Sequence, residues 1–150
     1  FKGASKRLEK IGENESTVIY KDFAHSPSKV EATTQAVKEQ YPDRTLLACL
    51  ELHTYSSLNQ NFLKEYKGTL DPADEALVFY SPHAVEIKRL EEIGKEEIEK
   101  AFERKDLLIY TEPASFKAFL FSQDLKDKVV LLMSSGNYGG LDFDEVKSLL

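Results

Sequence analysis

Short apolar runs alternate with amphipathic stretches along most of the chain. The runs are nearly continuous in apolar residues, which is typical of strands buried on both faces of a sheet. They occupy residues 16–20, 45–52, 76–80, 107–110 and 129–133. A weaker alternating run over residues 7–12 precedes the first of them, with turn-forming residues between. We therefore expect a β-hairpin at the start of the chain.

The stretches between the strands predict helices. The first starts at Ser26 and Pro27, a good N-cap followed by a residue suited to the first turn, and ends at Tyr41-Pro42. The last is expected over residues 142–150 and starts at Asp142, with Glu145 at the capping-box spacing. The other helices are expected at residues 59–66, 94–104 and 113–121, whereas residues 81–90 are expected to be irregular.

The resulting order of elements, β-β-α-β-α-β-α-β-α-β-α, predicts an α/β fold. We expect a single doubly wound, Rossmann-like sheet of about six strands, mostly parallel but mixed, with helices on both faces. The chain has 150 residues, 41% of them hydrophobic and 31% charged. These values suit one globular domain over residues 1–150.

Charge and cysteine content exclude several classes of partner. The formal net charge is −6 and no basic run offsets it, which argues against binding to nucleic acid or an anionic membrane. No apolar run approaches the length needed to span a bilayer, and no signal peptide is visible. The single cysteine, Cys49, cannot form an internal disulfide and favours a reducing, cytoplasmic location. Because Phe1 is not a natural start, we expect the chain to be part of a longer protein.

Candidate chemistry gathers in the segments that follow the predicted strands. These segments are residues 21–27, 51–59, 80–83 and 134–140, and they contain all three histidines, His25, His53 and His83. In a parallel sheet such segments share the carboxyl edge, where open α/β folds bind ligands. The sequence therefore predicts a ligand site at that edge, while His83 alone is better interpreted as an ordinary loop residue.

Known catalytic and metal motifs are absent from these segments. The histidines and Cys49 lack metal-site spacing, and Ser134-Ser135-Gly136 is not a nucleophile elbow. The glycine-rich loop over residues 136–140 is not a phosphate-binding fingerprint and has no following lysine. It either forms a tight turn or presents backbone N–H groups to a carboxylate or phosphate. Without a P-loop, the chain by itself is expected not to hydrolyse ATP.

Three segments carry a resemblance to a known family. Asp22-Phe23-Ala24-His25-Ser26-Pro27 resembles the Asp-(Tyr/Phe)-(Ala/Gly)-His-x-Pro signature of the third, C-terminal domain of the Mur ligases. Lys6-Arg7-Leu8-Glu9 is similar to the run that begins this domain. The stretch 131–140 is similar to its closing strand and loop, especially in the branches that add L-alanine or a murein tripeptide. The resemblance covers essentially the whole chain.

The resemblance implies an ATP-dependent, amide-forming ligase of peptidoglycan synthesis or recycling. Such enzymes join an amino acid or short peptide to UDP-N-acetylmuramate through an acyl phosphate. ATP and Mg²⁺ would be bound mainly by N-terminal and central domains of the same polypeptide, so the isolated chain would be inactive. Arg7 would approach the ATP phosphates and Asp22 the ribose hydroxyls. The incoming substrate would lie near His25, His53, Ser134, Ser135, Asn137 and Tyr138. The resemblance assigns no catalytic residue and no metal ligand to this chain.

Departures from the family pattern bear on the incoming substrate. Lys21 replaces a second acid, Ser26 replaces a second histidine, and residues 53–57 lack the arginines typical of alanine-adding members. Guanidinium groups are the usual clamps for a free amino acid's carboxylate, so their loss favours a tripeptide over L-alanine. The alternative interpretation is a free-standing, non-catalytic α/β module that binds a ligand or a partner.

Overall fold

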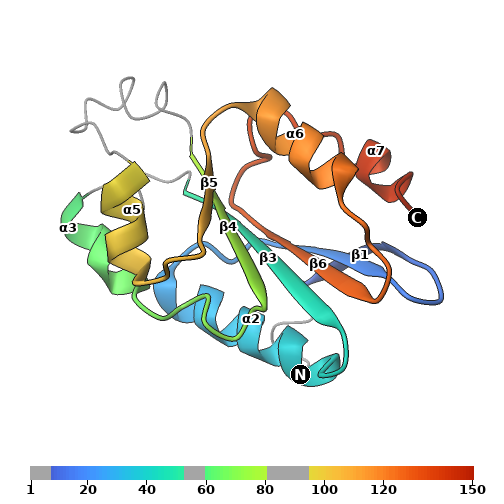
Figure 1. Cartoon of the computed structure of the whole chain (residues 1–150), viewed down its shortest axis with the longest axis horizontal. Helices are drawn as coiled ribbons and strands as arrows, with labels where there is room; N and C mark the ends of the chain where they lie inside the picture. Colours follow the sequence, from blue (N-terminus) through green and yellow to red (C-terminus); the bar gives the residue numbers. More distant parts are fainter. Residues whose placement is uncertain (1–7, 53–59, 81–94) are drawn as a thin grey trace.

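The protein is built around one six-stranded mixed sheet (Figure 1). The computed structural model describes residues 8–52, 60–80 and 95–150. The strands are β1 (Glu9–Glu13), β2 (Val18–Asp22), β3 (Thr45–Glu51), β4 (Glu75–Phe79), β5 (Leu108–Tyr110) and β6 (Lys128–Met133). Their order across the sheet is β1-β2-β6-β3-β4-β5. Among the strands of the described residues, β1 and β2 alone pair antiparallel, which confirms the predicted mostly parallel α/β sheet.

Helices cover both faces of the sheet, as predicted (Figure 1). They are α2 (Pro27–Gln40), α3 (Gln60–Leu63), the 3₁₀ helix η1 (Lys64–Tyr66), α5 (Lys95–Phe102), α6 (Pro113–Ser122) and α7 (Phe143–Lys147). Helices α2, α3 and α5 lie on one face, and α6 and α7 lie on the other. Alternate strand residues supply two separate cores: Val18 and Tyr20 pack with the first group, and Ile19 packs with the second. This alternation is what two covered faces require.

Strand β6 lies between β2 and β3 and thereby positions the site. Met133, its last residue, pairs with Asp22 on one side and with Leu50 on the other. The segments that follow β2, β3 and β6 therefore leave the same edge of the sheet beside one another. Residues far apart in the chain meet there because the parallel strands point the same way.

Several local predictions are refined by the structure. The helix expected at 59–66 is divided into α3 and η1, and α7 ends at Lys147 instead of continuing to the end of the chain. Asp142 caps α7 by accepting hydrogen bonds from the amides of Asp144 and Glu145. Ser26 occupies the N-cap of α2, but its side chain makes no capping hydrogen bond. The region 81–90 lies outside the described residues.

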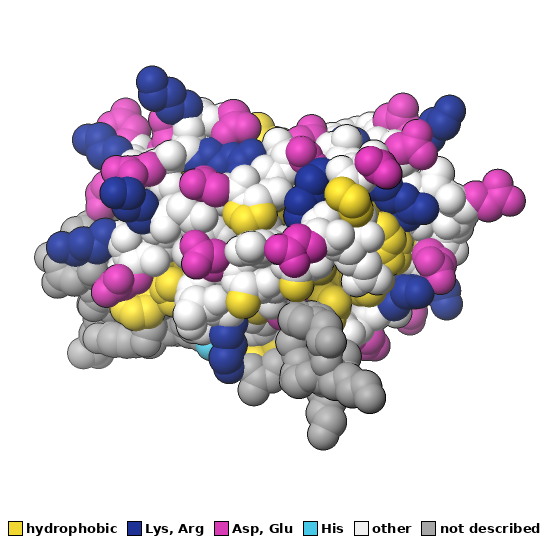
Figure 2. Space-filling view, turned by 90° about the horizontal axis from the view of Figure 1, so that it is seen from below, with side chains coloured by type: hydrophobic (Ala, Val, Ile, Leu, Met, Phe, Trp, Pro, Cys, Tyr) yellow, Lys and Arg dark blue, Asp and Glu magenta, His cyan; other side chains and the backbone are white. Residues whose placement is uncertain are grey.

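The face seen in Figure 2 carries charges of both signs. On the face seen in Figure 2, acidic and basic side chains are interspersed with small apolar areas. Within the described ranges, no helix is long and apolar enough to cross a membrane.

Candidate functional site

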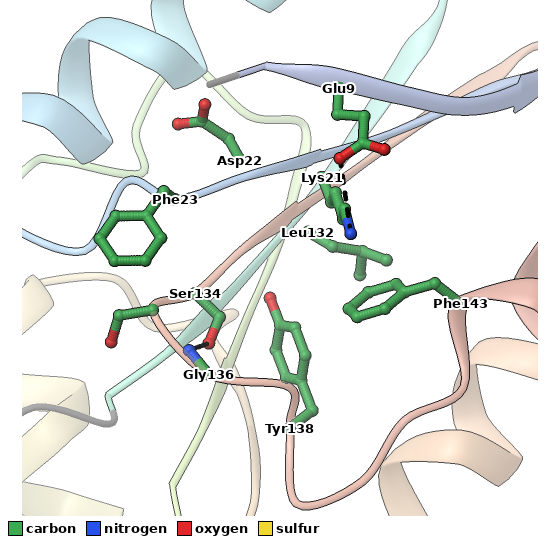
Figure 3. A pocket seen from close by; sticks show the side chains of 10 residues that line it. Glu9, Lys21, Asp22, Phe23, Leu132, Ser134, Gly136, Tyr138 and Phe143 are labelled. Atoms are coloured by element: carbon green, nitrogen blue, oxygen red, sulfur yellow. Dashed lines mark hydrogen bonds and ion pairs between the residues drawn. The ribbon is translucent and has the colours of Figure 1, made fainter. Parts of the chain in front are cut away.

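A pocket of about 520 Å³ lies at the carboxyl edge of the sheet, beside the ends of β2 and β6 (Figure 3). The strand β2, the loop after β6 and the first residue of α7 contribute most of its walls. The residues that line it are Glu9, Lys21, Asp22, Phe23, Leu132, Ser134, Ser135, Gly136, Tyr138 and Phe143. The pocket thus occupies the edge where the sequence predicts a ligand site.

Asp22 ends β2 and connects the site to helix α2. Its side chain is only 6% exposed, and Oδ2 accepts hydrogen bonds from the Ala24 amide at 3.0 Å and the Thr33 hydroxyl at 3.3 Å. Two donors on one oxygen fix the carboxylate plane. The second oxygen, Oδ1, makes no hydrogen bond to the described residues and can accept one from a ligand hydroxyl.

His25 lies on the same loop but does not line the pocket. Its Nδ1 is 2.8 Å from the Phe23 carbonyl oxygen, so in the neutral ring the proton is assigned to Nδ1 and Nε2 is left as an acceptor. The Phe23 ring, which is 51% exposed, meets the imidazole edge-on at 5.2 Å. The Tyr66 hydroxyl donates to the His25 carbonyl and anchors the loop to η1.

Lys21 is the one cationic side chain among the residues that line the pocket. Its Nζ is 3.5 Å from a Glu9 carboxylate oxygen and 4.7 Å from the centre of the Phe143 ring. Figure 3 shows Lys21 between Glu9 and Phe143. Both Lys21 and Glu9 are partly exposed, so this ion pair holds the ammonium weakly and leaves it available to an anion.

The loop after β6 is held by a buried carboxylate from β3. Glu51, which is 3% exposed, accepts hydrogen bonds from the Ser134 hydroxyl at 2.5 Å and the Tyr138 amide at 2.8 Å. The Ser134 oxygen in turn accepts from the Gly136 amide at 2.7 Å. One carboxylate therefore orders five consecutive residues of the loop.

Tyr138 is buried under the pocket. Its hydroxyl lies 2.7 Å from the Cys49 carbonyl oxygen and 2.9 Å from that of Met133, and its ring stacks on Phe116 at 4.9 Å. Burial raises the pKa of the phenol well above its usual value, so the hydroxyl stays protonated and acts as a donor. The Tyr138 amide and hydroxyl both hydrogen-bond within the protein, so Tyr138 contributes its ring to the lining of the pocket.

The glycines of this loop serve a tight turn. Gly139 and Gly140 have φ of 74° and 112°, and a Cβ on Gly139 would lie 2.7 Å from Pro113. The exposed Asn137 closes the turn, because its side-chain oxygen accepts from the Gly140 amide at 3.1 Å. The turn interpretation of Gly139 and Gly140 is therefore confirmed.

Ser135 differs from its neighbour Ser134. In the described ranges, its Oγ is the buried side-chain polar atom that has no hydrogen-bond partner. Because Ser135 lines the pocket, this hydroxyl is available to a hydrogen-bonding group that enters the pocket.

The structure brings Asp22, Ser134, Ser135 and Tyr138 to one pocket and leaves His25 and Asn137 beside it. Arg7 and His53 lie outside the described residues, as does His83. No group of metal-ligating side chains gathers within the described parts of the chain. Sequence reasoning missed Glu51, although an acid near the end of an otherwise apolar strand was a signal that could have revealed it.

Comparison with known proteins places the chain in a family. The family model described as "Mur ligase, glutamate ligase domain" matches residues 6–136. The UDP-N-acetylmuramate–L-alanine ligase of Hydrogenobaculum is 24% identical over 148 residues, 99% of this chain and 32% of that protein. The same-named enzyme of Caldanaerobacter subterraneus is 29% identical over 138 residues, 91% of this chain and 30% of that protein. The chain thus spans about a third of the length of these curated relatives.

Solved structures show the same fold. A murein peptide ligase from Psychrobacter arcticus matches with a TM-score of 0.73 and 21% identity, over 95% of this chain and 29% of that one. An isolated domain from Haemophilus ducreyi, described as part of a UDP-N-acetylmuramate:L-alanyl-γ-D-glutamyl-meso-diaminopimelate ligase, matches with a TM-score of 0.64 and 21% identity. That match covers 96% of this chain and 100% of the solved one. The resemblance found in the sequence is therefore confirmed, and the chain belongs to the Mur ligase family as its glutamate ligase domain.

Proposed function

We propose that this chain is the C-terminal domain of a longer, ATP-dependent ligase of peptidoglycan synthesis or recycling. The ligase would join an amino acid or short peptide to UDP-N-acetylmuramate. The observation that carries the proposal is the pocket at the carboxyl edge, bounded by Asp22 and the ordered loop after β6. Since the chain spans about a third of its relatives, N-terminal and central domains would supply the sites for ATP, Mg²⁺ and the UDP-linked substrate. This reaction is expected in the cytoplasm.

The reaction requires two steps. The muramate carboxylate attacks the γ-phosphorus of ATP, which releases ADP and forms an acyl phosphate. The incoming amine then attacks the acyl carbon, loses a proton and expels phosphate as the amide forms. In this scheme Arg7 binds ATP phosphates, Asp22 accepts from the ribose hydroxyls, and the pocket holds the incoming amine. Closure of this domain over the others would exclude water from the hydrolysable acyl phosphate.

A ligation assay on the full-length protein tests the proposal. Incubation with ATP, Mg²⁺, UDP-N-acetylmuramate and either L-alanine or a murein tripeptide should yield the amide product and one phosphate per bond. Absence of product with every amine tried, from protein that is folded and binds ATP, would favour the non-catalytic module.

The 150-residue chain alone should fold but not turn over ATP. Its sheet has both faces covered, and the Haemophilus ducreyi domain was solved on its own. We expect a cooperative thermal transition together with ATP turnover at the level of buffer. Turnover that co-purifies with the chain through two unrelated columns would contradict this prediction.

The incoming substrate should be a short peptide rather than L-alanine. Residues 53–59 contain no arginine that could bind the carboxylate of a free amino acid beside its reacting amine. Lys21 is the cation that lines the pocket, and it suits a peptide, whose carboxylate lies far from the reacting amine. We expect L-alanyl-γ-D-glutamyl-meso-diaminopimelate to have a kcat/KM at least about 100-fold above that of L-alanine. Both amines should be compared at saturating UDP-N-acetylmuramate. Efficient use of L-alanine alone would favour the activity named for the curated relatives.

A further inference from the structure

We propose that Glu51 is a positioning residue of this site. Its carboxylate holds the loop after β6 so that Ser135 and Gly136 face the pocket, and Ser134 transmits this restraint. The assignment deepens the proposed function and rests on it for its kinetic consequences, but not for its structural ones. Sequence reasoning assigned no role to Glu51, and the structure gives the two adjacent serines different roles.

Burial makes the hydrogen bonds of Glu51 important for the stability of the loop. A carboxylate that is 3% exposed is costly unless donors surround it. Oε1 meets two of them, the Ser134 hydroxyl at 2.5 Å and the Tyr138 amide at 2.8 Å. Short hydrogen bonds to a charged acceptor are stronger than those between neutral groups. Both donors belong to the loop, so the carboxylate ties the end of β3 to that loop.

Ser134 connects Glu51 to the Gly136 amide. Its hydroxyl hydrogen is directed to Glu51, so its oxygen lone pairs are left to accept from the Gly136 amide at 2.7 Å. This polarity leaves the Ser134 hydroxyl no hydrogen to donate to a ligand. Ser135, whose Oγ is buried without a partner, retains that hydrogen. Of the two serines, Ser135 is the one equipped to contact a substrate oxygen.

The backbone at Tyr138 shows that the loop is restrained. Its φ is 56°, a left-handed conformation that is uncommon for a bulky residue. Such a conformation persists only where surrounding contacts fix it. Here the Glu51 carboxylate holds the amide, the Cys49 and Met133 carbonyls accept from the hydroxyl, and Phe116 stacks on the ring. Glu51 is the contact in this set that acts directly on the loop backbone.

Amide hydrogen exchange on the 150-residue chain tests the restraint. Glu51→Ala should speed exchange at Gly136 and Tyr138 by about tenfold or more, because the loop loses its acceptor. Glu51→Gln keeps an acceptor oxygen and should stay close to the wild type. Glu75→Ala is the matched control: Glu75 pairs with Lys128 at 2.8 Å at the amino end of β4 and should leave both amides unchanged. Unchanged exchange in both Glu51→Ala and Ser134→Ala would overturn the assignment.

Steady-state kinetics of the full-length ligase separate positioning from simple stability. Glu51→Ala and Ser134→Ala should raise the KM for the incoming amine about tenfold and leave the KM for ATP within about twofold. Glu51→Gln, which keeps an acceptor oxygen, should leave the KM for the incoming amine close to that of the wild type. Ser135→Ala should raise the same KM without changing exchange at Gly136 and Tyr138. A lower melting temperature with both KM values unchanged would make Glu51 merely structural and overturn the proposal.

Failure of the proposed function gives a different result. If the full-length protein makes no amide bond while Glu51→Ala still speeds exchange in the loop, the ligase proposal fails and the positioning of the loop by Glu51 stands.

Discussion

Tyr138→Ala should lower the free energy of unfolding of the chain by about 3–5 kcal/mol. The ring is 1% exposed and packs between Phe116, at 4.9 Å, and Phe79, at 5.9 Å, so its removal leaves a cavity between the sheet and α6. The hydroxyl also bridges the ends of β3 and β6. For a domain of this size the melting temperature should fall by about 10 °C. Urea unfolding followed by circular dichroism measures the free energy directly.

Tyr138→Phe is the matched control for this cavity. It keeps the ring and removes only the donor to the Cys49 and Met133 carbonyls, so the loss should be about 1 kcal/mol. Equal losses in the two variants would show that the hydroxyl, and not the packed ring, dominates. A loss below about 1 kcal/mol in Tyr138→Ala would show that the surrounding side chains collapse into the space of the ring, so that no cavity remains.

The elements of the fold could be predicted from local pattern. Buried strands such as β3 are continuous apolar runs, and helix starts such as Pro27 carry turn or cap chemistry that acts within a few residues. Even the shortened α7 starts where Asp142 predicts it. Local signals of this kind are readable because the interactions that produce them span only a few positions.

The order of the strands could not be obtained in the same way. Strand β6 pairs with β2, whose partner residues lie 111 positions earlier, and with β3, whose partner residues lie 83 positions earlier. Nothing in an apolar run states which neighbour it will meet. The contact between Glu51 and the loop after β6 depends on this pairing. A pattern could mark Glu51 as an acid in an apolar strand, but only the three-dimensional structure shows which donors it satisfies.

The candidate site was therefore predictable in place but not in detail. Asp22 and the loop after β6 were expected at the carboxyl edge, and they meet there. Both Ser134 and Ser135 were expected to contact the substrate. In the structure the Ser134 hydroxyl donates to Glu51, whereas the Ser135 hydroxyl has no hydrogen-bond partner. That distinction depends on side-chain direction relative to β3, which residue spacing does not encode.

In the proposed full-length ligase, Asp22→Asn should raise the KM for ATP by about 10–100-fold. Hydrogen bonds to a charged group contribute about 1.5–3 kcal/mol, and replacing Oδ1 by an amide nitrogen removes the acceptor for a ribose hydroxyl. Asparagine retains one oxygen for the Ala24 amide and the Thr33 hydroxyl, so the fold should be nearly unaffected. Initial rates at varied ATP, together with a thermal melt, measure both consequences.

Thr33→Val separates the internal hydrogen bond of the Asp22 carboxylate from its proposed contact with nucleotide. It removes the internal donor 3.3 Å from Oδ2 while leaving the charge and Oδ1 in place. We expect the free energy of unfolding to fall by about 1 kcal/mol and the KM for ATP to change little. If instead Asp22→Asn leaves the KM for ATP unaltered and both variants lower the melting temperature alike, Asp22 holds α2 to the sheet and does not bind nucleotide. The opposite pattern, a raised KM in Asp22→Asn alone, is the one that a nucleotide contact through Oδ1 requires.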